Sequence, residues 1–149
     1  MTVHYDRGGL PEGASGNEAK MTGVTNTELS SIGQIAMPVR DLTRGVEFYR
    51  DRLGLRFLFQ VQPGLAFFEC GSIRLMVEVP PDKEFQRPGS VLYFNVGDID
   101  EAYRELRQRG VVFRGEPHLI AKMPDHELWM AFFSDGEGNT HALMQERRS

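Results

Sequence analysis

One strand, turn and helix pattern occurs twice in this chain. Residues 32–58 read IGQIAMPVRDLTRGVEFYRDRLGLRFL, and a similar pattern returns from Ser90 as SVLYFNVGDIDEAYRELRQRGVVF. Aligning the two turns at Val39 and Val96 places Gln34 opposite Val91. A chain of 149 residues is long enough for one well-packed core and too short for two ordinary domains. We therefore expect a single domain made of two similar modules.

Each copy predicts a strand followed by an amphipathic helix. Residues 33–39 alternate between apolar and other side chains, as a strand with one face in a core does. Asp41 then stands where a helix N-cap is needed. In the second copy, residues 91–96 form the predicted strand and Asp98 caps a helix over residues 99–109.

Three short apolar runs separated by turn residues follow each helix. They are residues 55–60, 65–69 and 73–79 after the first helix, and 111–113, 128–133 and 140–145 after the second. Each module therefore reads β-α-β-β-β, which predicts an α+β fold with modules at about 32–80 and 90–146 inside a domain spanning residues 29–149. The main difference is an inserted segment, PHLIAKMPDH, which we expect to form a loop at the rim.

Composition limits the remaining possibilities. Residues 1–28 are rich in Gly, Ser, Thr, Asn and Glu and have no apolar period, so we expect a flexible leader there. The net charge is −4 with both signs interspersed, which argues against nucleic acid and anionic membranes as partners. No stretch is apolar enough to span a bilayer, and no signal pattern begins the sequence, so we expect a soluble cytoplasmic protein. Cys70 has no disulfide partner and is expected to be a buried structural thiol.

Strand alternation predicts which side chains line the side of the sheets that the helices do not cover. From the first strand of each module these are Gln34, Ala36, Val91, Tyr93 and Asn95; from the last strands they are Arg74, Met76, Glu78, Ala142 and Met144. A face built only for packing does not need so many polar groups. A pocket for a small molecule, with a few convergent polar groups among apolar ones, does.

The inserted segment carries the other candidate residues. His118 and His126 stand at its two ends, next to Glu127 and Trp129, and loops at the rim of a scaffold are where binding groups and general bases concentrate. The alternative is that these histidines are simply solvated. Trp129 either packs in the core or closes over a ligand. His141 is predicted to point to the helix side of the sheet as a satisfied histidine without a ligand role.

The whole of residues 32–148 resembles the vicinal oxygen chelate superfamily. The resemblance rests on the paired β-α-β-β-β units, the V-x-D-[LI] turns at Val39 and Val96, the helix motif of residues 48–55, and the closing D-G-E-G-N turn at residues 135–139. The superfamily includes glyoxalase I, methylmalonyl-CoA epimerase, extradiol dioxygenases, fosfomycin-resistance proteins and metal-free bleomycin-binding proteins. Its members are often homodimers, and we expect one here.

In the metal-dependent members, the resemblance implies a divalent ion held by one residue from the first and last strand of each module. Those positions are Gln34, Met76, Val91 and Ala142 in this chain. Only Gln34 can coordinate a cation. We therefore expect that the metal site has been lost and that no cofactor is needed, with a bound divalent metal as the alternative.

Three functions remain open. The preferred one is a metal-free protein that binds a small molecule through Gln34, Arg74, Met76, Val91, Tyr93, Asn95, Trp129 and Ala142. The alternative is a metal-dependent lyase or isomerase of glyoxalase or epimerase type, with Glu78 as the base. The third is a metal-independent enzyme that uses His118, His126 or Glu127 as acid or base, or an interaction partner without a small ligand.

Overall fold

The computed structural model describes residues 26–82 and 87–148. Contacts between residues divide the chain into two units, Met1–Ile32 and Gly33–Ser149, and the fold described below belongs to the second. The predicted leader lies outside the described residues except for residues 26–28, and so do residues 83–86 of the connector between the modules.

The first module is a four-stranded sheet with one helical segment. Its elements are β1 (Gln34–Pro38), α2 (Leu42–Glu47), the π-helix η1 (Phe48–Arg52), β2 (Arg56–Val61), β3 (Leu65–Cys70) and β4 (Ile73–Glu78). The sheet order is β1-β4-β3-β2, in which β1 is parallel to β4 and the other pairs are antiparallel. Asp41 caps α2 as predicted, because its carboxylate accepts a 3.1 Å hydrogen bond from the Arg44 N–H.

The first helical segment differs from the regular helix that the periodicity predicts. After Glu47 the hydrogen bonding changes to the wider π pattern, with the Leu53 N–H donating to the Phe48 carbonyl at 2.9 Å. Two consecutive large rings, Phe48 and Tyr49, are both buried in this turn. Spacing of apolar residues alone does not distinguish such a turn from an α-helix.

The second module repeats this arrangement with an additional strand. Its elements are β5 (Tyr93–Asn95), α3 (Ile99–Gln108), β6 (Val112–Phe113), β7 (His118–Lys122), β8 (His126–Ser134) and β9 (Thr140–Arg148). The sheet order is β5-β9-β8-β6, with β7 also paired to β8. Asp98 caps α3 as predicted, accepting hydrogen bonds from two backbone N–H groups of the first turn. The strand predicted at residues 91–96 is shorter, at Tyr93–Asn95.

The prediction that the inserted segment is a loop is wrong. It forms β7, which pairs antiparallel with the first half of β8, and the Met123 N–H closes the turn by donating to the His126 carbonyl at 2.8 Å. The hairpin satisfies backbone groups that a loop would have to leave to water. His118 and His126 therefore lie on strands.

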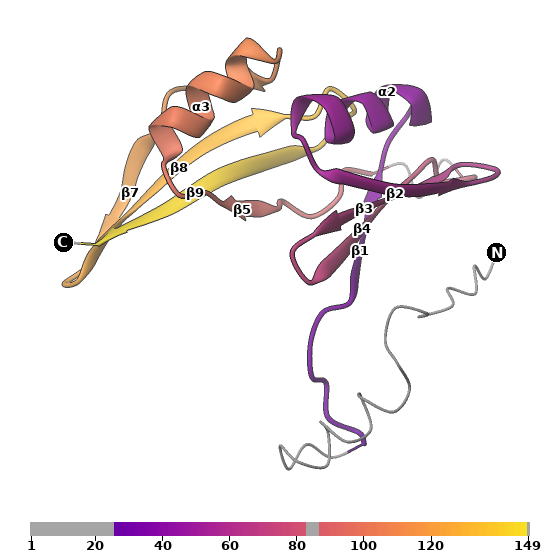
Figure 1. Cartoon of the computed structure of the whole chain (residues 1–149), viewed down its shortest axis with the longest axis horizontal. Helices are drawn as coiled ribbons and strands as arrows, with labels where there is room; N and C mark the ends of the chain where they lie inside the picture. Colours follow the sequence, from indigo (N-terminus) through magenta and orange to yellow (C-terminus); the bar gives the residue numbers. More distant parts are fainter. Residues whose placement is uncertain (1–25, 83–86, 149) are drawn as a thin grey trace. The chain divides into compact units, whose positions relative to one another are not determined.

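One hydrophobic core joins the two modules. Met37, Val39 and Phe68 of the first module belong to the same buried cluster as Ile99 and Phe133 of the second. Figure 1 shows α3 lying along one face of the second sheet and α2 covering one face of the first. The residues of the core lie on these helix-covered faces, so the opposite face of each sheet is not part of this core.

Two further sequence expectations meet the structure here. Cys70 is half-buried rather than fully buried, because it ends β3 at the edge of the core, and burial raises the pKa of its thiol. Within the described residues, no helix has the length and apolar character needed to cross a membrane.

Candidate ligand-binding face of the second sheet

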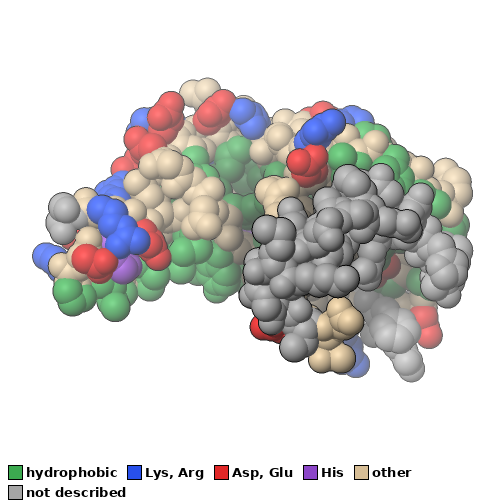
Figure 2. Space-filling view, turned by 60° about the horizontal axis from the view of Figure 1, so that its bottom comes forward, with side chains coloured by type: hydrophobic (Ala, Val, Ile, Leu, Met, Phe, Trp, Pro, Cys, Tyr) green, Lys and Arg blue, Asp and Glu red, His purple; other side chains and the backbone are tan. Residues whose placement is uncertain are grey.

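The face of the second sheet that α3 does not cover is built from two rows of side chains. Residues paired directly across neighbouring strands point to the same side of a sheet. One row is Tyr93, Ala142 and Phe132, and the other is Asn95, Met144, Met130 and His118. Aromatic rings, thioethers and one amide thus share a single surface. In Figure 2, hydrophobic side chains gather at the lower left of the view, on the side where this sheet lies.

Ala142 lies beneath two aromatic rings. Its partners across the strands are Tyr93 on β5 and Phe132 on β8, and the two ring centroids are 6.3 Å apart in an edge-to-face arrangement. The alanine is fully buried, whereas Tyr93 is 48% exposed. A small residue at this position lets the two rings meet above it, so the space over Ala142 is occupied by aromatic carbon.

His118 extends this aromatic surface. Its ring lies 6.3 Å from that of Phe132 at 32°, and its Nδ1 is 3.2 Å from the Glu116 carbonyl oxygen. Asn95 is exposed in the adjacent row and offers an amide donor and acceptor. Val91, just before β5, adds an exposed aliphatic side chain. The surface can stack against a flat apolar molecule and orient it with a few polar groups.

The first sheet presents the corresponding face with different chemistry. The register pairs Gln34 with Arg74, Ala36 with Met76, and Pro38 with Glu78, which places these side chains on the side away from the core residues of β1 and β4. The Gln34 Nε2 lies 3.6 Å from the Met76 Sδ. Glu78 is half-buried at the end of β4.

The residues at the four positions implied for a metal do not fit a divalent cation. Gln34 has an amide oxygen, and its nitrogen is directed to Met76, which has only a thioether. Val91 and Ala142 carry no donor atom, and Ala142 is covered by the Tyr93 and Phe132 rings. One neutral oxygen and one thioether are a poor set for Mg²⁺, Mn²⁺, Ni²⁺ or Zn²⁺.

The predicted acid and base residues do not converge. His118 is paired with Met130, four residues along β8 from His126, so the two histidines are separated by about 13 Å of strand. His126 contacts Asp125 through Nδ1 at 2.8 Å, and Glu78 belongs to the first sheet. The structure thus places these three candidates at separate positions.

Trp129 and Glu127 lie on the helix-facing side of β8. The Trp129 indole packs against the core, its N–H donates to a Glu127 carboxylate oxygen at 3.1 Å, and the Arg147 guanidinium lies 4.4 Å from the ring centroid. This cation–π contact and hydrogen bond hold both side chains on the side of the sheet opposite the candidate face.

A buried polar network that the sequence did not reveal connects the two modules. The Tyr49 hydroxyl donates to Asp135 Oδ2 at 2.7 Å and lies 2.9 Å from Nε2 of His141. Nδ1 of His141 accepts from the Leu92 N–H at 3.2 Å, which fixes the proton on Nε2 and makes that nitrogen the donor to Tyr49. His141 therefore lies on the helix side, as predicted.

The environment keeps this network in one protonation state. Burial lowers the pKa of His141 to about 4, and the nearby Asp135 opposes that shift only in part. Burial also raises the pKa of Tyr49, and the negative charge of Asp135 raises it further. Both rings are thus neutral around Asp135. The only sequence signal was a tyrosine in the first helix and an acidic turn far along the chain.

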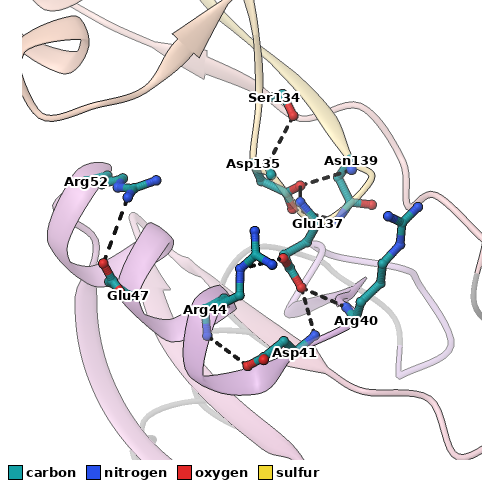
Figure 3. A network of polar contacts seen from close by, with 10 residues as sticks. Arg40, Asp41, Arg44, Glu47, Arg52, Ser134, Asp135, Glu137 and Asn139 are labelled. Carbon is teal, nitrogen blue, oxygen red and sulfur yellow. Dashed lines mark hydrogen bonds and ion pairs between the residues drawn. The ribbon is translucent and has the colours of Figure 1, made fainter.

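The D-G-E-G-N turn is the hairpin turn between β8 and β9 that the sequence predicted, and its side chains also reach the first module. Asn139 donates to the Pro38 carbonyl at 2.7 Å and accepts from the Gly89 N–H at 2.7 Å. Glu137 accepts from the Arg40 and Asp41 N–H groups at 3.0 and 2.7 Å (Figure 3). The turn therefore ties together the beginning of α2, the end of β1 and the connector.

Comparisons with known proteins agree with this architecture. Residues 31–143 match the family model described as Glyoxalase/Bleomycin resistance protein/Dioxygenase superfamily. YraH of Bacillus subtilis (strain 168) is 29% identical over 125 residues, which cover 75% of this chain and 93% of YraH. TnmS3, an antibiotic binding protein from Streptomyces sp. CB03234, has a TM-score of 0.63 at 26% identity, covering 81% of this chain and 99% of TnmS3.

A lactoylglutathione lyase from Agrobacterium tumefaciens has the same TM-score of 0.63 at 23% identity, covering 79% of this chain and 95% of the lyase. At that identity the likeness concerns the fold alone.

Proposed function

The chain belongs to the Glyoxalase/Bleomycin resistance protein/Dioxygenase superfamily, and on that premise we propose that it binds a small organic molecule without a metal ion. The proposed site is the face of the second sheet that carries Tyr93, Phe132 and His118. The observation that carries the proposal is the burial of Ala142 beneath the Tyr93 and Phe132 rings. The two aromatic rings occupy the space where a metal-coordinating side chain at position 142 would lie.

The chemistry of this face favours a flat, largely apolar ligand. Tyr93 and Phe132 offer ring faces and edges for stacking, and Met130 and Met144 are soft side chains that adapt to irregular shapes. Asn95 is the nearest polar group able to orient such a ligand. The similarity to TnmS3, an antibiotic binding protein, supports a role in binding natural products or drugs.

A thermal-shift screen tests this proposal. The compounds are α-keto thiol adducts, acyl-CoA esters, catechols, polycyclic aromatics and glycopeptide drugs. We expect flat aromatic compounds to raise the unfolding temperature, because a ligand at a hundredfold excess over its Kd stabilises the folded state by about 2.7 kcal/mol. A set in which no compound stabilises the protein contradicts the proposal.

A matched pair of variants locates the site. Tyr93→Ser removes a 48% exposed ring from the proposed face, and Val112→Ser removes a 69% exposed side chain from β6 of the same sheet. We expect the first variant to lose the shift given by the ligand and the second to keep it. Equal loss in both variants places the binding elsewhere.

The lyase or isomerase alternative has a distinct result in the same experiments. It requires an activity on α-keto thiol adducts or acyl-CoA esters that depends on a divalent ion and on Gln34 and Glu78. An activity of that kind overturns the proposal in favour of an enzyme.

We also propose that the chain forms a homodimer. Several large apolar side chains of the second module outside the proposed ligand site are exposed, among them Leu119, Ile120 and Met123. Exposed apolar surface of this kind is covered in many proteins by a second copy. Light scattering after size-exclusion chromatography should give twice the mass of one chain, and a monomer at micromolar concentration contradicts this part of the proposal.

A further inference from the structure

A small pocket opens on a different part of the molecule, where the two modules and their connector meet. Its volume is about 30 Å³, and it is lined by Arg40 after β1, by Arg87 of the connector, and by Glu137 and Gly138 of the β8–β9 turn. It shares no residue with the face proposed for the organic ligand. Its chemistry is also different, because two arginines and a glutamate line it beside Pro38, Val39 and Pro88.

The carboxylate in this pocket is already engaged. The Glu137 side chain is 3% exposed, and its Oε1 accepts the two hydrogen bonds from the backbone at Arg40 and Asp41. Its other oxygen lies 3.5 Å from Nε of Arg44 (Figure 3). Two N–H donors and one guanidinium compensate this single charge, so Glu137 is not the partner of the remaining cations.

Two guanidinium groups in the pocket have no such partner within residues 26–82 and 87–148. Among the described residues, neither the Arg40 side chain nor the Arg87 side chain makes a hydrogen bond or an ion pair. Arg40 is nevertheless held in place: a Cβ on Gly138 would come within 3.2 Å of its terminal nitrogen, and Gly138 has a φ of +95°. The glycine thus allows the guanidinium to lie close against the turn.

We propose that this pocket binds a phosphate group, either as inorganic phosphate or as a phosphate monoester, between Arg40 and Arg87. Two guanidinium groups match the charge of a phosphate dianion, and each can donate two N–H bonds to its oxygens. The pocket is small and open on one side, so phosphate oxygens can enter it to reach the guanidinium groups while the rest of the phosphate, or the ester substituent of a monoester, extends into solvent. A bound phosphate connects the turn before α2 to the connector between the modules.

Thermal unfolding in the presence of inorganic phosphate tests the proposal, with potassium chloride adjusted to keep the ionic strength constant. We expect a saturable rise in the unfolding temperature, on the order of 5–10 °C at a hundredfold excess over Kd. Repeating the titration with methyl phosphate distinguishes the two forms of the ligand. A larger rise with methyl phosphate assigns the site to a monoester, and a larger rise with inorganic phosphate assigns it to the free ion.

Three variants locate the effect. Arg40→Gln and Arg87→Gln should each abolish the rise while leaving the unfolding temperature without phosphate nearly unchanged, because neither side chain has a bond to lose within the described residues. Arg56→Gln, which removes an exposed arginine paired with Glu69 at 3.3 Å, should keep the rise. No rise in the wild type, or a rise that survives in Arg40→Gln or Arg87→Gln, overturns the proposal.

Discussion

The Tyr49 hydroxyl donates a 2.7 Å hydrogen bond to Oδ2 of Asp135, a residue 86 positions later in the chain. Tyr49 is fully buried in the helical segment of the first module, and Asp135 begins the turn between the last two strands of the second. The same carboxylate accepts hydrogen bonds from the Glu137 and Asn139 N–H groups at 2.7 and 3.0 Å. This contact joins the modules at the centre of their shared core.

Removing the Tyr49 hydroxyl should therefore weaken the fold. Tyr49→Phe deletes a bond to a charged acceptor and leaves Nε2 of His141 without its partner. We expect the free energy of unfolding to fall by about 2 kcal/mol in urea titrations. Tyr103→Phe is the control, because the Tyr103 ring packs on Phe113 and no hydrogen bond of its hydroxyl is seen among the described residues. Equal effects of the two substitutions contradict the structural role of the network.

His141 makes stability depend on pH. Burial lowers its pKa from 6.5 to about 4 in the folded protein, so between these values the unfolded chain binds a proton that the folded chain does not. Stability should therefore be complete above pH 6.5, decrease as the pH falls toward 4, and lose about 3 kcal/mol in total. Unfolding by urea at a series of pH values measures this loss.

The contribution of His141 is separated from that of the carboxylates by a variant. His141→Gln has no titrating group at this position, so its stability should decrease less steeply between pH 6.5 and 4 than that of the wild type. The difference between the two curves is the quantity of interest. Parallel curves over this range show that His141 is not the titrating group.

Gly45 sets how closely α2 approaches the first sheet. A Cβ at this position would lie 3.2 Å from both methyl groups of Val39 and 3.2 Å from Val77. Alanine in a helix is favoured over glycine by about 1 kcal/mol, but crowding in a packed core costs about 1–3 kcal/mol. We expect Gly45→Ala to lower the unfolding free energy by about 1 kcal/mol, whereas Gly115→Ala, with no atom within 4 Å, should be nearly neutral. A more stable Gly45→Ala protein contradicts this close packing.

Local patterns in the sequence predicted the fold well. The two caps, Asp41 and Asp98, form as predicted because an N-cap depends on the side chain and the N–H groups of the next turn. The alternation of β1 and β4 placed Gln34, Arg74 and Met76 on one face for the same local reason, and the register agrees. The repeat also led to the superfamily that the family model confirms.

Features that depend on distant contacts were not predicted. The strand β7 was predicted to be a loop, because its structure depends on pairing with β8 and the run from His118 to Lys122 has no clear alternation. The bond between Tyr49 and Asp135 left no local pattern either. The sequence shows that Ala142 stands at an implied metal-ligand position without a donor atom. Only the structure shows the Tyr93 and Phe132 rings above it.

The metal content of the purified protein tests whether the chain functions without a bound divalent ion. Protein purified without a chelator is measured by inductively coupled plasma mass spectrometry, beside Gln34→Ala and Glu78→Gln variants. Aromatic surface over Ala142 and the lack of donor atoms at Val91 predict far less than one divalent ion per chain, with no difference among the three proteins. One equivalent of Ni, Zn, Mn or Fe in the wild type, lost on substitution of Gln34 or Glu78, contradicts metal-free binding.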